Sequence, residues 1–507
     1  MRIHTIAQRG AIAAACAALA TTALLGGNAG AASLDEPVST PVPISTPDGV
    51  LMSYVVNASS ADATATGLVE KAVAASGGVV VQSWPQIGVV VAHSTRSAFR
   101  TDVVAKGGSA VQSVGATRTA APVEGTPSDL NASWGRGVSA GQRGTTMKQL
   151  PPEDPMVNSD PVSQDPREAE QWDMAMIKAD QAHGLTDGNR SVLVGVLDSG
   201  IDHDHPDLAP NIDIPSSVNC TNAGRPDLSP TGWWPTTSDH GTHVAGTIAA
   251  ARNGVGIVGV APNARMASVK VVNNDGYIYP EYAVCGFMWS GLKHMDVTNN
   301  SYYVDPFMFW CEDQPDQYAA KEAVRRAVTW STKQGVVHAA AAGNARYDLA
   351  NKTTDATSPN DSTSVLRTIN SRCEDIPAEL DGVVTVSSME RYPAGTMESR
   401  LSGFSNRGLG KIDVAAPGSR ILSTIVRDNG YGLKSGTSMA SPHTAGVLAL
   451  LKSAHPDWTP AQLIAGLRAQ ADDKACGPTT AGAECVGPVE DNSYFGEGVI
   501  DALDAVS

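Results

Sequence analysis

The order of hydrophobic and polar positions predicts a sheet-containing domain from about residue 166 onward. Short apolar runs recur there and are separated by helical patterns. Runs of this kind are typical of strands that are buried on both faces, so we expect an α/β domain with a parallel sheet covered by helices on both sides. The runs are SVLVGVLDSG (191–200), ARMASVKVV (264–272), GVVHAAAAGN (335–344) and GVVTVSSM (382–389).

A different pattern precedes this region. Residues 48–120 carry strand-like runs such as LMSYVVNA and GGVVVQSWPQIGVVVAHS, together with helical stretches such as ATGLVEKAVAAS and RSAFRTDVVAK. The order is strand, helix, strand, strand, helix, strand, which predicts a small α+β unit of the ferredoxin-like type. Residues 121–165 are rich in Pro, Gly, Ser, Asp and Thr without periodicity, so we expect a flexible linker that is a natural place for a proteolytic cut.

The first residues have the features of a secretory signal. Arg2 and Arg9 provide a positive start, AIAAACAALATTALL provides an apolar stretch, and AGA provides small residues at the end. We therefore expect a signal peptide over residues 1–31. No later segment has a long uninterrupted apolar run, so we expect that the protein does not associate with a membrane once the signal is removed. The remaining region from 166 to 507 is the predicted sheet-containing domain.

Composition narrows the classes of partner. Of 507 residues, 42% are hydrophobic and 17% charged, which is ordinary for a globular protein, and the net charge is −16. Nucleic acid phosphates would be repelled by such a surface, so we expect no nucleic acid partner. Without the signal six cysteines remain, an even number that indicates disulfides in an exported chain. Cys476 and Cys485 flank a short loop and are the expected pair, while the pairing of the others stays open: Cys220, Cys285, Cys311 and Cys373.

Polar residues follow several of the apolar runs. Asp198 ends the first of them, Asn344 ends another, His240 begins HGTHVAG, and Ser438 stands in SGTSMASPH before a hydrophobic helix. Each has a simple structural explanation, such as a turn, a core histidine or a helix cap. Together they are the groups that activate a hydroxyl and stabilise an oxyanion, and sites in parallel sheets gather beyond the carboxyl ends of the strands.

Four ordered motifs resemble those of the subtilisin-like serine proteases (subtilases): VLDSGID, DHGTHVAGTIAA, VVHAAAAGN and SGTSMASPHTAGVLALL. The chain order Asp, His, Ser is that of this family. The resemblance covers roughly 166–507 and implies Ser438 as nucleophile, His240 as general base and Asp198 as the orienting carboxylate. It implies Asn344 as the oxyanion-hole side chain, and residues 48–120 as a propeptide that assists folding and then inhibits the enzyme.

The resemblance also bears on neighbouring residues. His243 in HGTHVAG and His443 in ASPH are expected to be packed core residues.

The family uses a segment of the type Ser-Leu-Gly as one wall of the pocket for the residue before the cut. Here Ser301 matches, but Tyr302 and Tyr303 replace the smaller residues, which either narrows the entrance or reflects packing under the insertion that follows. The other wall consists of Ala341, Ala342 and Gly343 and implies room for an apolar side chain.

The sequence thus predicts a secreted, extracellular, monomeric serine endopeptidase made as a self-processing precursor, acting on protein or peptide substrates, with its own propeptide as inhibitor. The alternatives are a processing protease or peptide cyclase of narrow specificity, or a peptide-binding pseudoprotease, although no triad member is missing. No cofactor is expected. The run DHDHPDL has carboxylates and histidines without a recognisable ligand spacing, so a structural calcium ion is compatible with the resemblance but no metal ligand is assigned.

Overall fold

The computed structural model describes residues 36–122, 164–477 and 484–507. The predicted signal peptide and nearly all of the predicted linker lie outside these ranges. Residues 37–507 form one compact unit, which contains a small N-terminal domain and a larger domain built on the predicted sheet.

The N-terminal domain consists of one sheet and two helices in the order that the sequence predicts. Its sheet has the strand order β2-β3-β1-β4 with antiparallel neighbours throughout. Val55, Val69 and Phe99 are fully buried in its core, because apolar side chains of β1 and both helices face one another. The elements are β1 (Met52–Ala58), α1 (Ala63–Ala75), β2 (Gly78–Trp84), β3 (Val89–Ser94), α2 (Phe99–Gly107) and β4 (Val111–Ala116).

The larger domain is organised around a sheet with the strand order β16-β15-β11-β9-β5-β8-β6-β7, in which β17 also pairs with β15. The central pairs are parallel, as predicted, but β16 and β7 run antiparallel at the two ends. Neither end strand had a strong apolar run. The bounds are β5 (Leu193–Asp198), β6 (Val218–Asn222), β7 (Arg225–Asp227), β8 (Arg265–Lys270), β9 (Val297–Asn300), β11 (Val337–Ala341), β15 (Val383–Arg391), β16 (Ser399–Leu401) and β17 (Val414–Pro417).

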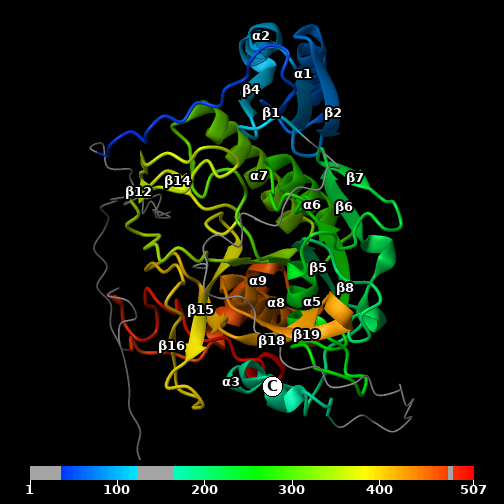
Figure 1. Cartoon of the computed structure of the whole chain (residues 1–507), viewed down its shortest axis with the longest axis vertical. Coiled ribbons are helices and arrows are strands. Elements are labelled where there is room, and N and C mark those ends of the chain that lie inside the picture. The colour runs from blue at the N-terminus through cyan, green and yellow to red at the C-terminus, as the bar shows by residue number, and fades with distance from the viewer. Residues whose placement is uncertain (1–35, 123–163, 478–483) are drawn as a thin grey trace, which may run out of the picture. The chain divides into compact units, whose positions relative to one another are not determined.

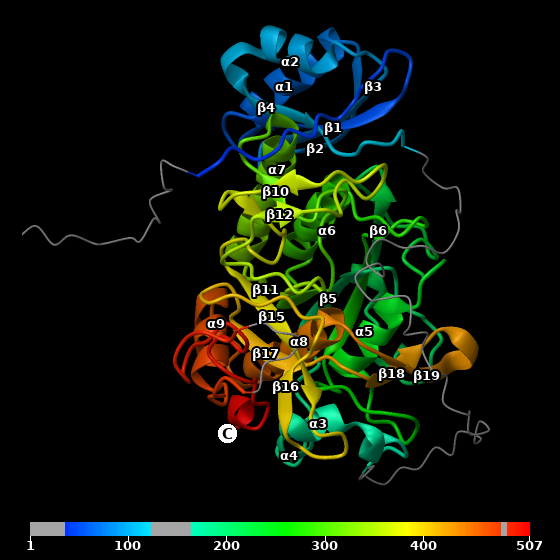
Figure 2. The same ribbon diagram turned by 60° about the vertical axis from the view of Figure 1, so that its left-hand side comes forward.

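Both faces of this sheet are covered. On β5, Leu193 and Leu197 belong to the core shared with α6 (Pro280–Leu292) and α7 (Pro315–Lys333). Val194 and Val196 point the other way, into the core shared with α5 (His240–Ala249) and α8 (Thr437–Ala454). Figures 1 and 2 show α5 and α8 side by side against the central strands. A strand with two buried faces explains the continuous apolar run from which β5 was predicted.

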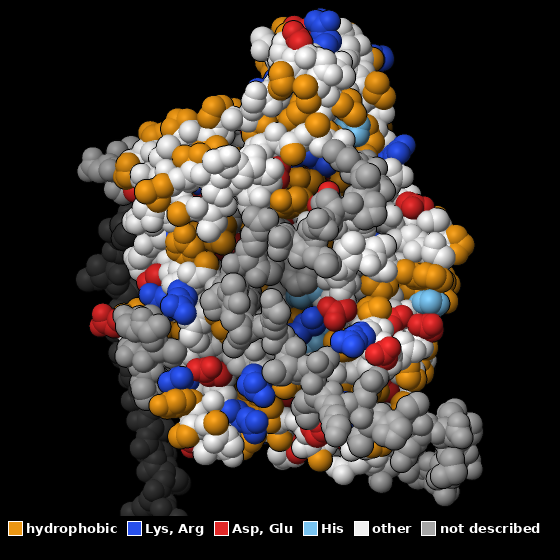
Figure 3. All heavy atoms as spheres, viewed as in Figure 1, with side chains coloured by type: hydrophobic (Ala, Val, Ile, Leu, Met, Phe, Trp, Pro, Cys, Tyr) orange, Lys and Arg blue, Asp and Glu red, His pale blue; other side chains and the backbone are white. Residues whose placement is uncertain are grey.

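Smaller elements complete the larger domain. These are α3 (Trp172–Met176), α4 (Ala179–Ala182), α9 (Pro460–Ala469), and the strand pairs β10 (Trp310–Cys311) with β14 (Cys373–Glu374), β12 (Thr354–Asp355) with β13 (Arg367–Thr368), and β18 (Ile421–Ile425) with β19 (Gly430–Lys434). No helix in the described ranges is both long enough and apolar enough to cross a membrane. On the face shown in Figure 3, basic and acidic side chains are interspersed.

The N-terminal domain contacts α7 through polar groups of its sheet. Asn57 of β1 donates to the carbonyl of Ala319 at 2.8 Å, and the backbone amide of Ala116 in β4 donates to Asp316 at 3.0 Å. Arg326 of α7 donates to the carbonyls of Ala58 and Ile87, each at 3.0 Å. The sheet of this domain is therefore held against a helix of the larger domain along its length.

Candidate active site

Three neighbouring strands end together at one edge of the central sheet. In the register of β5, β9 and β11, Leu197 lies opposite Asn300, and Asn300 lies opposite Ala340. Asp198, Ser301 and Ala341 are the next residues along their strands, so they lie at the same edge. The structure therefore brings the predicted carboxylate and both predicted pocket walls to the place where sites form in parallel sheets.

Asp198 and His240 form a buried hydrogen-bonded pair. His240 Nδ1 lies 2.8 Å from Oδ1 and 2.9 Å from Oδ2 of Asp198, and the two residues are only 4% and 1% exposed. Asp198 also accepts a hydrogen bond from the amide of Ser199 at 2.7 Å. Because a carboxylate only accepts, Nδ1 carries the proton and Nε2 is the basic nitrogen of the imidazole.

Ser438 lies in the first turn of α8 and exchanges hydrogen bonds with Ser301. Its hydroxyl donates to the carbonyl of Ser301 at 3.2 Å, and the Ser301 hydroxyl donates to the carbonyl of Ser438 at 2.8 Å. The Ser438 carbonyl is available because Pro442, four residues on, has no amide to donate to it. Pro442 is the sixth residue of α8, and its missing amide leaves the Ser438 carbonyl free to bind Ser301.

Asn344 is positioned by Thr437, the residue before Ser438. Its Oδ1 accepts hydrogen bonds from the amide and the hydroxyl of Thr437, at 2.8 and 2.9 Å. The serine and threonine side chains do not cap α8 in the simple way that the local sequence suggested, because Gly436 is the N-cap residue and Asn344 supplies the cap. With Oδ1 occupied, the NH₂ group of Asn344 remains the part of the side chain that can donate to an oxyanion.

The loop before His240 is anchored by Lys270, which sequence reasoning did not single out. Lys270 ends β8 opposite Asp198, and its amine donates to the carbonyl of Trp234 at 3.1 Å and the hydroxyl of Thr236 at 2.9 Å. Burial lowers the pKa of Lys270 to about 8. The signal in the sequence was a lysine within an otherwise apolar strand run.

The two tyrosines of the predicted pocket wall are packed. Tyr302 is 5% exposed and donates to Asn300 Oδ1 at 3.1 Å, while the Tyr303 hydroxyl accepts from Asn360 at 3.0 Å. Burial raises the pKa of both phenols well above the usual value. On the other wall, Gly343 has φ +97°, and a Cβ there would lie 2.4 Å from Asn406 Nδ2, so only glycine fits.

The other two histidines of the motifs are structural in their contacts, as expected. His243 Nε2 lies 3.1 Å from the carbonyls of both Ile421 and Gly432, and burial lowers its pKa well below the usual value. The ring of His443 contacts the carbonyl of Met439 at 2.8 Å and Asp173 at 2.9 Å.

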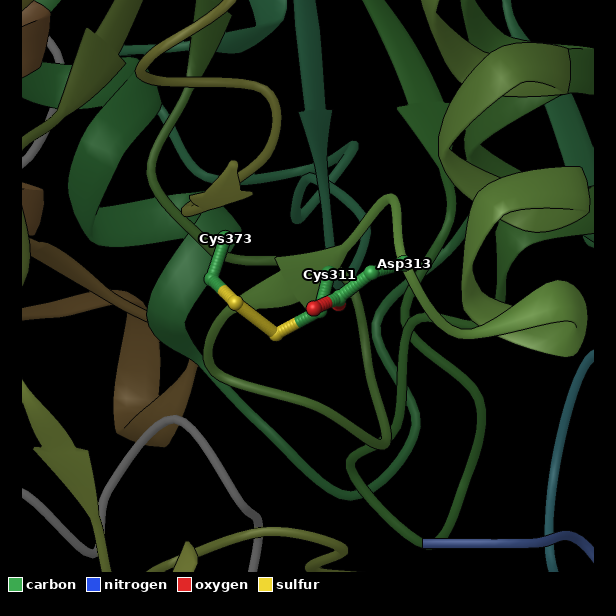
Figure 4. A group of neighbouring side chains, drawn as sticks. All are labelled: Cys311, Asp313 and Cys373. Atoms are coloured by element: carbon green, nitrogen blue, oxygen red, sulfur yellow. A yellow bond between two sulfur atoms is a disulfide. The ribbon is translucent and has the colours of Figure 1, made fainter. Parts of the chain in front are cut away.

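Disulfides account for all six cysteines expected in the exported chain. The pairs are Cys220–Cys285, Cys311–Cys373 and Cys476–Cys485, which confirms the last pair as predicted. Figure 4 shows Asp313 beside the Cys311–Cys373 bond. Because both sulfurs are consumed by the disulfide, this group lacks the thiolates that a metal site would need.

Within the described ranges, the other possible metal-ligand cluster is Asp202, His203 and Asp204 in the run DHDHPDL. Burial and the neighbouring Asp204 raise the pKa of Asp202 to about 6. This local cluster alone supports no ligand set.

The chain is similar to known proteins of one family. The model of the subtilase family matches residues 189–498. Subtilisin E of Bacillus subtilis is 32% identical over 312 residues, which are 61% of this chain and 67% of that protein. A subtilisin of Bacillus pumilus is 33% identical over 297 residues, which are 58% of this chain and 88% of that protein.

Solved structures show the same fold. The epidermin leader peptide processing serine protease EpiP of Staphylococcus aureus superposes with a TM-score of 0.63 at 20% identity, over 90% of this chain and 98% of that one. Fervidolysin of Fervidobacterium pennivorans, a keratinolytic enzyme related to subtilisin, gives a TM-score of 0.60 at 23% identity, over 90% of this chain and 61% of that one. The extent of the family match and the similarity to subtilisins together show that the chain belongs to the subtilase family of serine endopeptidases.

Proposed function

We propose that this chain is a secreted endopeptidase made as a self-processing precursor, with Asp198, His240 and Ser438 as its catalytic triad. The observation that carries the proposal is the hydrogen-bonded Asp198–His240 pair at the sheet edge where α8 presents Ser438. His240 Nε2 removes the proton of the Ser438 hydroxyl, and Asp198 stabilises the imidazolium that forms. An acyl-enzyme then forms on Ser438 and is hydrolysed by water.

The Ser438 hydroxyl must first turn from the Ser301 carbonyl toward the imidazole. Its hydrogen bond to that carbonyl is 3.2 Å long, and rotation about the Cα–Cβ bond of Ser438 would release the hydroxyl from it. In the acyl-transfer step, the NH₂ group of Asn344 and the backbone amide of Ser438 stabilise the oxyanion.

The N-terminal domain serves as folding aid and inhibitor in this proposal. It packs on α7 and, through Arg118, on α6, where the Arg118 guanidinium pairs with Glu281. The chain leaves this domain at Pro122, so cleavage within residues 121–165 separates it from the catalytic domain. The predicted signal peptide supports secretion, and the mature enzyme acts as a monomer on protein or peptide substrates.

Ser438→Ala tests this proposal directly. Full-length precursor should shorten itself on incubation, whereas the variant should remain full length while keeping its circular dichroism spectrum and thermal transition. Ser441→Ala is the matched control, since Ser441 lies one turn further along α8 with its hydroxyl bonded to Asn299 at 2.7 Å. A Ser438→Ala precursor that still matures without added protease contradicts the assigned nucleophile.

A second candidate function is a processing protease of narrow specificity. It is favoured by the aromatic pocket wall, in which Tyr303 is held by Asn360. EpiP, with which the fold superposes, is itself a leader peptide processing protease. The two functions differ in a peptide-library digest, because a narrow enzyme leaves most peptides intact.

A further inference from the structure

Asp375 is a buried carboxylate that the proposed mechanism does not use. The residue is 1% exposed, and in the described part of the chain its Oδ1 has no hydrogen-bond partner. Its backbone is held firmly, since its amide donates to Glu379 Oε2 at 2.8 Å and its carbonyl accepts from the Glu379 amide at 2.8 Å. A buried carboxylate oxygen without a donor is costly, so its retention at a fixed position needs an explanation.

Asp375 lies close to Gly343 of one predicted pocket wall, and its charge acts on Tyr303 of the other. On one side, a Cβ placed on Gly343 would lie 3.5 Å from Asp375 Oδ2. On the other side, Asp375 is close enough to Tyr303 for its negative charge to raise the pKa of the phenol, after the larger effects of burial and of Asp305. The carboxylate is therefore near residues of both predicted pocket walls.

Two lysines bind the neighbouring acid Glu379. Lys352 lies 2.7 Å from Glu379 Oε1, and Lys411 lies 3.1 Å from the same oxygen. Burial and then the charge of Glu379 raise the pKa of Asp375 well above its usual value, although Lys352 opposes this. A cation placed beside Asp375 would thus donate a hydrogen bond to the unpaired Oδ1. It would also be attracted by the negative charge of the carboxylate.

We propose that Asp375 is the specificity residue of the pocket for the side chain before the cleaved bond and that it selects arginine or lysine there. This inference rests on the proposed endopeptidase function and replaces the apolar preference expected from Ala341, Ala342 and Gly343. These residues present no bulky side chain to a long aliphatic stem, and in this proposal the terminal guanidinium or ammonium donates to Asp375 Oδ1.

The test uses enzyme matured from the full-length chain and peptides that differ only in the residue before the scissile bond. Values of kcat/KM for arginine and lysine should exceed that for leucine at least about tenfold, as expected for one buried charged hydrogen bond. Peptide aldehydes ending in arginine should inhibit the unmodified enzyme more strongly than those ending in leucine. This second measurement needs no variant and so does not depend on the folding of one.

Asp375→Asn should lower the arginine-to-leucine ratio by about 10²-fold while leaving leucine cleavage within a few fold of the unmodified enzyme. Asp381→Asn, which alters an exposed acid six residues further on, should leave the ratio unchanged. Preference for leucine in the unmodified enzyme, or an unchanged ratio in Asp375→Asn, overturns the role of Asp375 alone. Failure to cleave any of the peptides contradicts the proposed function and this inference with it.

Discussion

Asp198 positions the proposed general base with both of its carboxylate oxygens. Each oxygen lies within 2.9 Å of His240 Nδ1, and Oδ1 also accepts the amide of Ser199. The carboxylate is thus oriented by the backbone before it orients the imidazole. The proton of His240 therefore stays on Nδ1 because both oxygens of Asp198 can only accept a hydrogen bond.

Replacing Asp198 by asparagine should therefore disable proton transfer without removing the imidazole. The amide NH₂ can face Nδ1 and favour the tautomer with its proton on Nε2, which cannot accept the serine proton. We expect kcat to fall on the order of 10⁴-fold at neutral pH, the order found for loss of this aspartate in subtilisin itself, with little change in KM. Steady-state kinetics with Asp204→Asn as the control would check this, and a loss below about tenfold would contradict it.

The raised pKa of Asp375 predicts that the preference for arginine over leucine changes with pH. Burial, followed by Glu379, raises this pKa, so the carboxyl group gains its proton at a higher pH than an ordinary aspartate does. The neutral acid attracts a guanidinium less, so the arginine-to-leucine ratio of kcat/KM should fall as pH falls and recover as pH rises. Effects of His240 on the rate cancel in this ratio. Asp375→Asn should give a flat ratio between about pH 5 and 9, and a persistent slope in this variant would assign the titration elsewhere.

At the residue scale, the types of the proposed catalytic groups follow from the sequence, but their contacts do not. Asp198, His240, Asn344 and Ser438 follow from the chemistry of hydroxyl activation and from the order of the motifs. The Ser438 hydroxyl donates to Ser301 instead of His240, and this depends on a side-chain rotation that no sequence pattern encodes.

At the scale of elements, a buried ion pair joins the N-terminal domain to α6. The Arg118 and Glu281 side chains are 2% and 0% exposed, and Glu281 also accepts from Ser53 at 2.7 Å. The Arg118 guanidinium lies 3.8 Å from the ring centre of Tyr279. Removing one partner of such a pair leaves the other charge buried, which typically costs about 3–5 kcal/mol.

Arg118→Met should consequently loosen the N-terminal domain. In full-length protein carrying Ser438→Ala, so that no cleavage occurs, we expect amide hydrogen exchange in β1 and β4 to accelerate at least about 100-fold. Arg96→Ala is the control, because Arg96 is 55% exposed and its pair with Asp102 contributes little. Equal exchange rates in the two variants would show that the Arg118–Glu281 pair does not hold the domain in place.

Elements were predicted where burial on both faces produced a continuous apolar run, as for β5, β8, β11 and β15. The central strand β9 was not among those runs because its residues, Val297–Asn300, are mostly polar. Asn300 hydrogen-bonds to the carbonyl of Ala339 and to Thr298, so tertiary contacts satisfy these polar groups in a fully buried strand. Local propensity could not reveal them.

At the scale of the whole molecule, the proposed pocket residue Asp375 comes from a segment far along the chain from Tyr303. The Cys311–Cys373 disulfide and the β10–β14 pair hold this segment beside the one that follows Tyr303. The sequence predicted both walls from motifs but left the pairing of these cysteines open, and with it the path of the segment that carries Asp375. Specificity was thus the part of the function least accessible to sequence patterns.

The proposed specificity and the proposed self-processing together predict where the precursor is cut. Within residues 121–165 the basic residues are Arg136, Arg143 and Lys148. If Asp375 selects a basic side chain, N-terminal sequencing of the mature enzyme should place its first residue directly after one of these three. Asp375→Asn should mature more slowly or at a different bond, whereas Ser438→Ala should not mature at all.

Replacing all three basic residues by glutamine should block maturation at these bonds in an enzyme that is otherwise unmodified. An unchanged mature N-terminus in that variant would show that the cut does not depend on a basic residue. Because the variant alters only the substrate segment, its outcome separates the choice of bond from the capacity to cut.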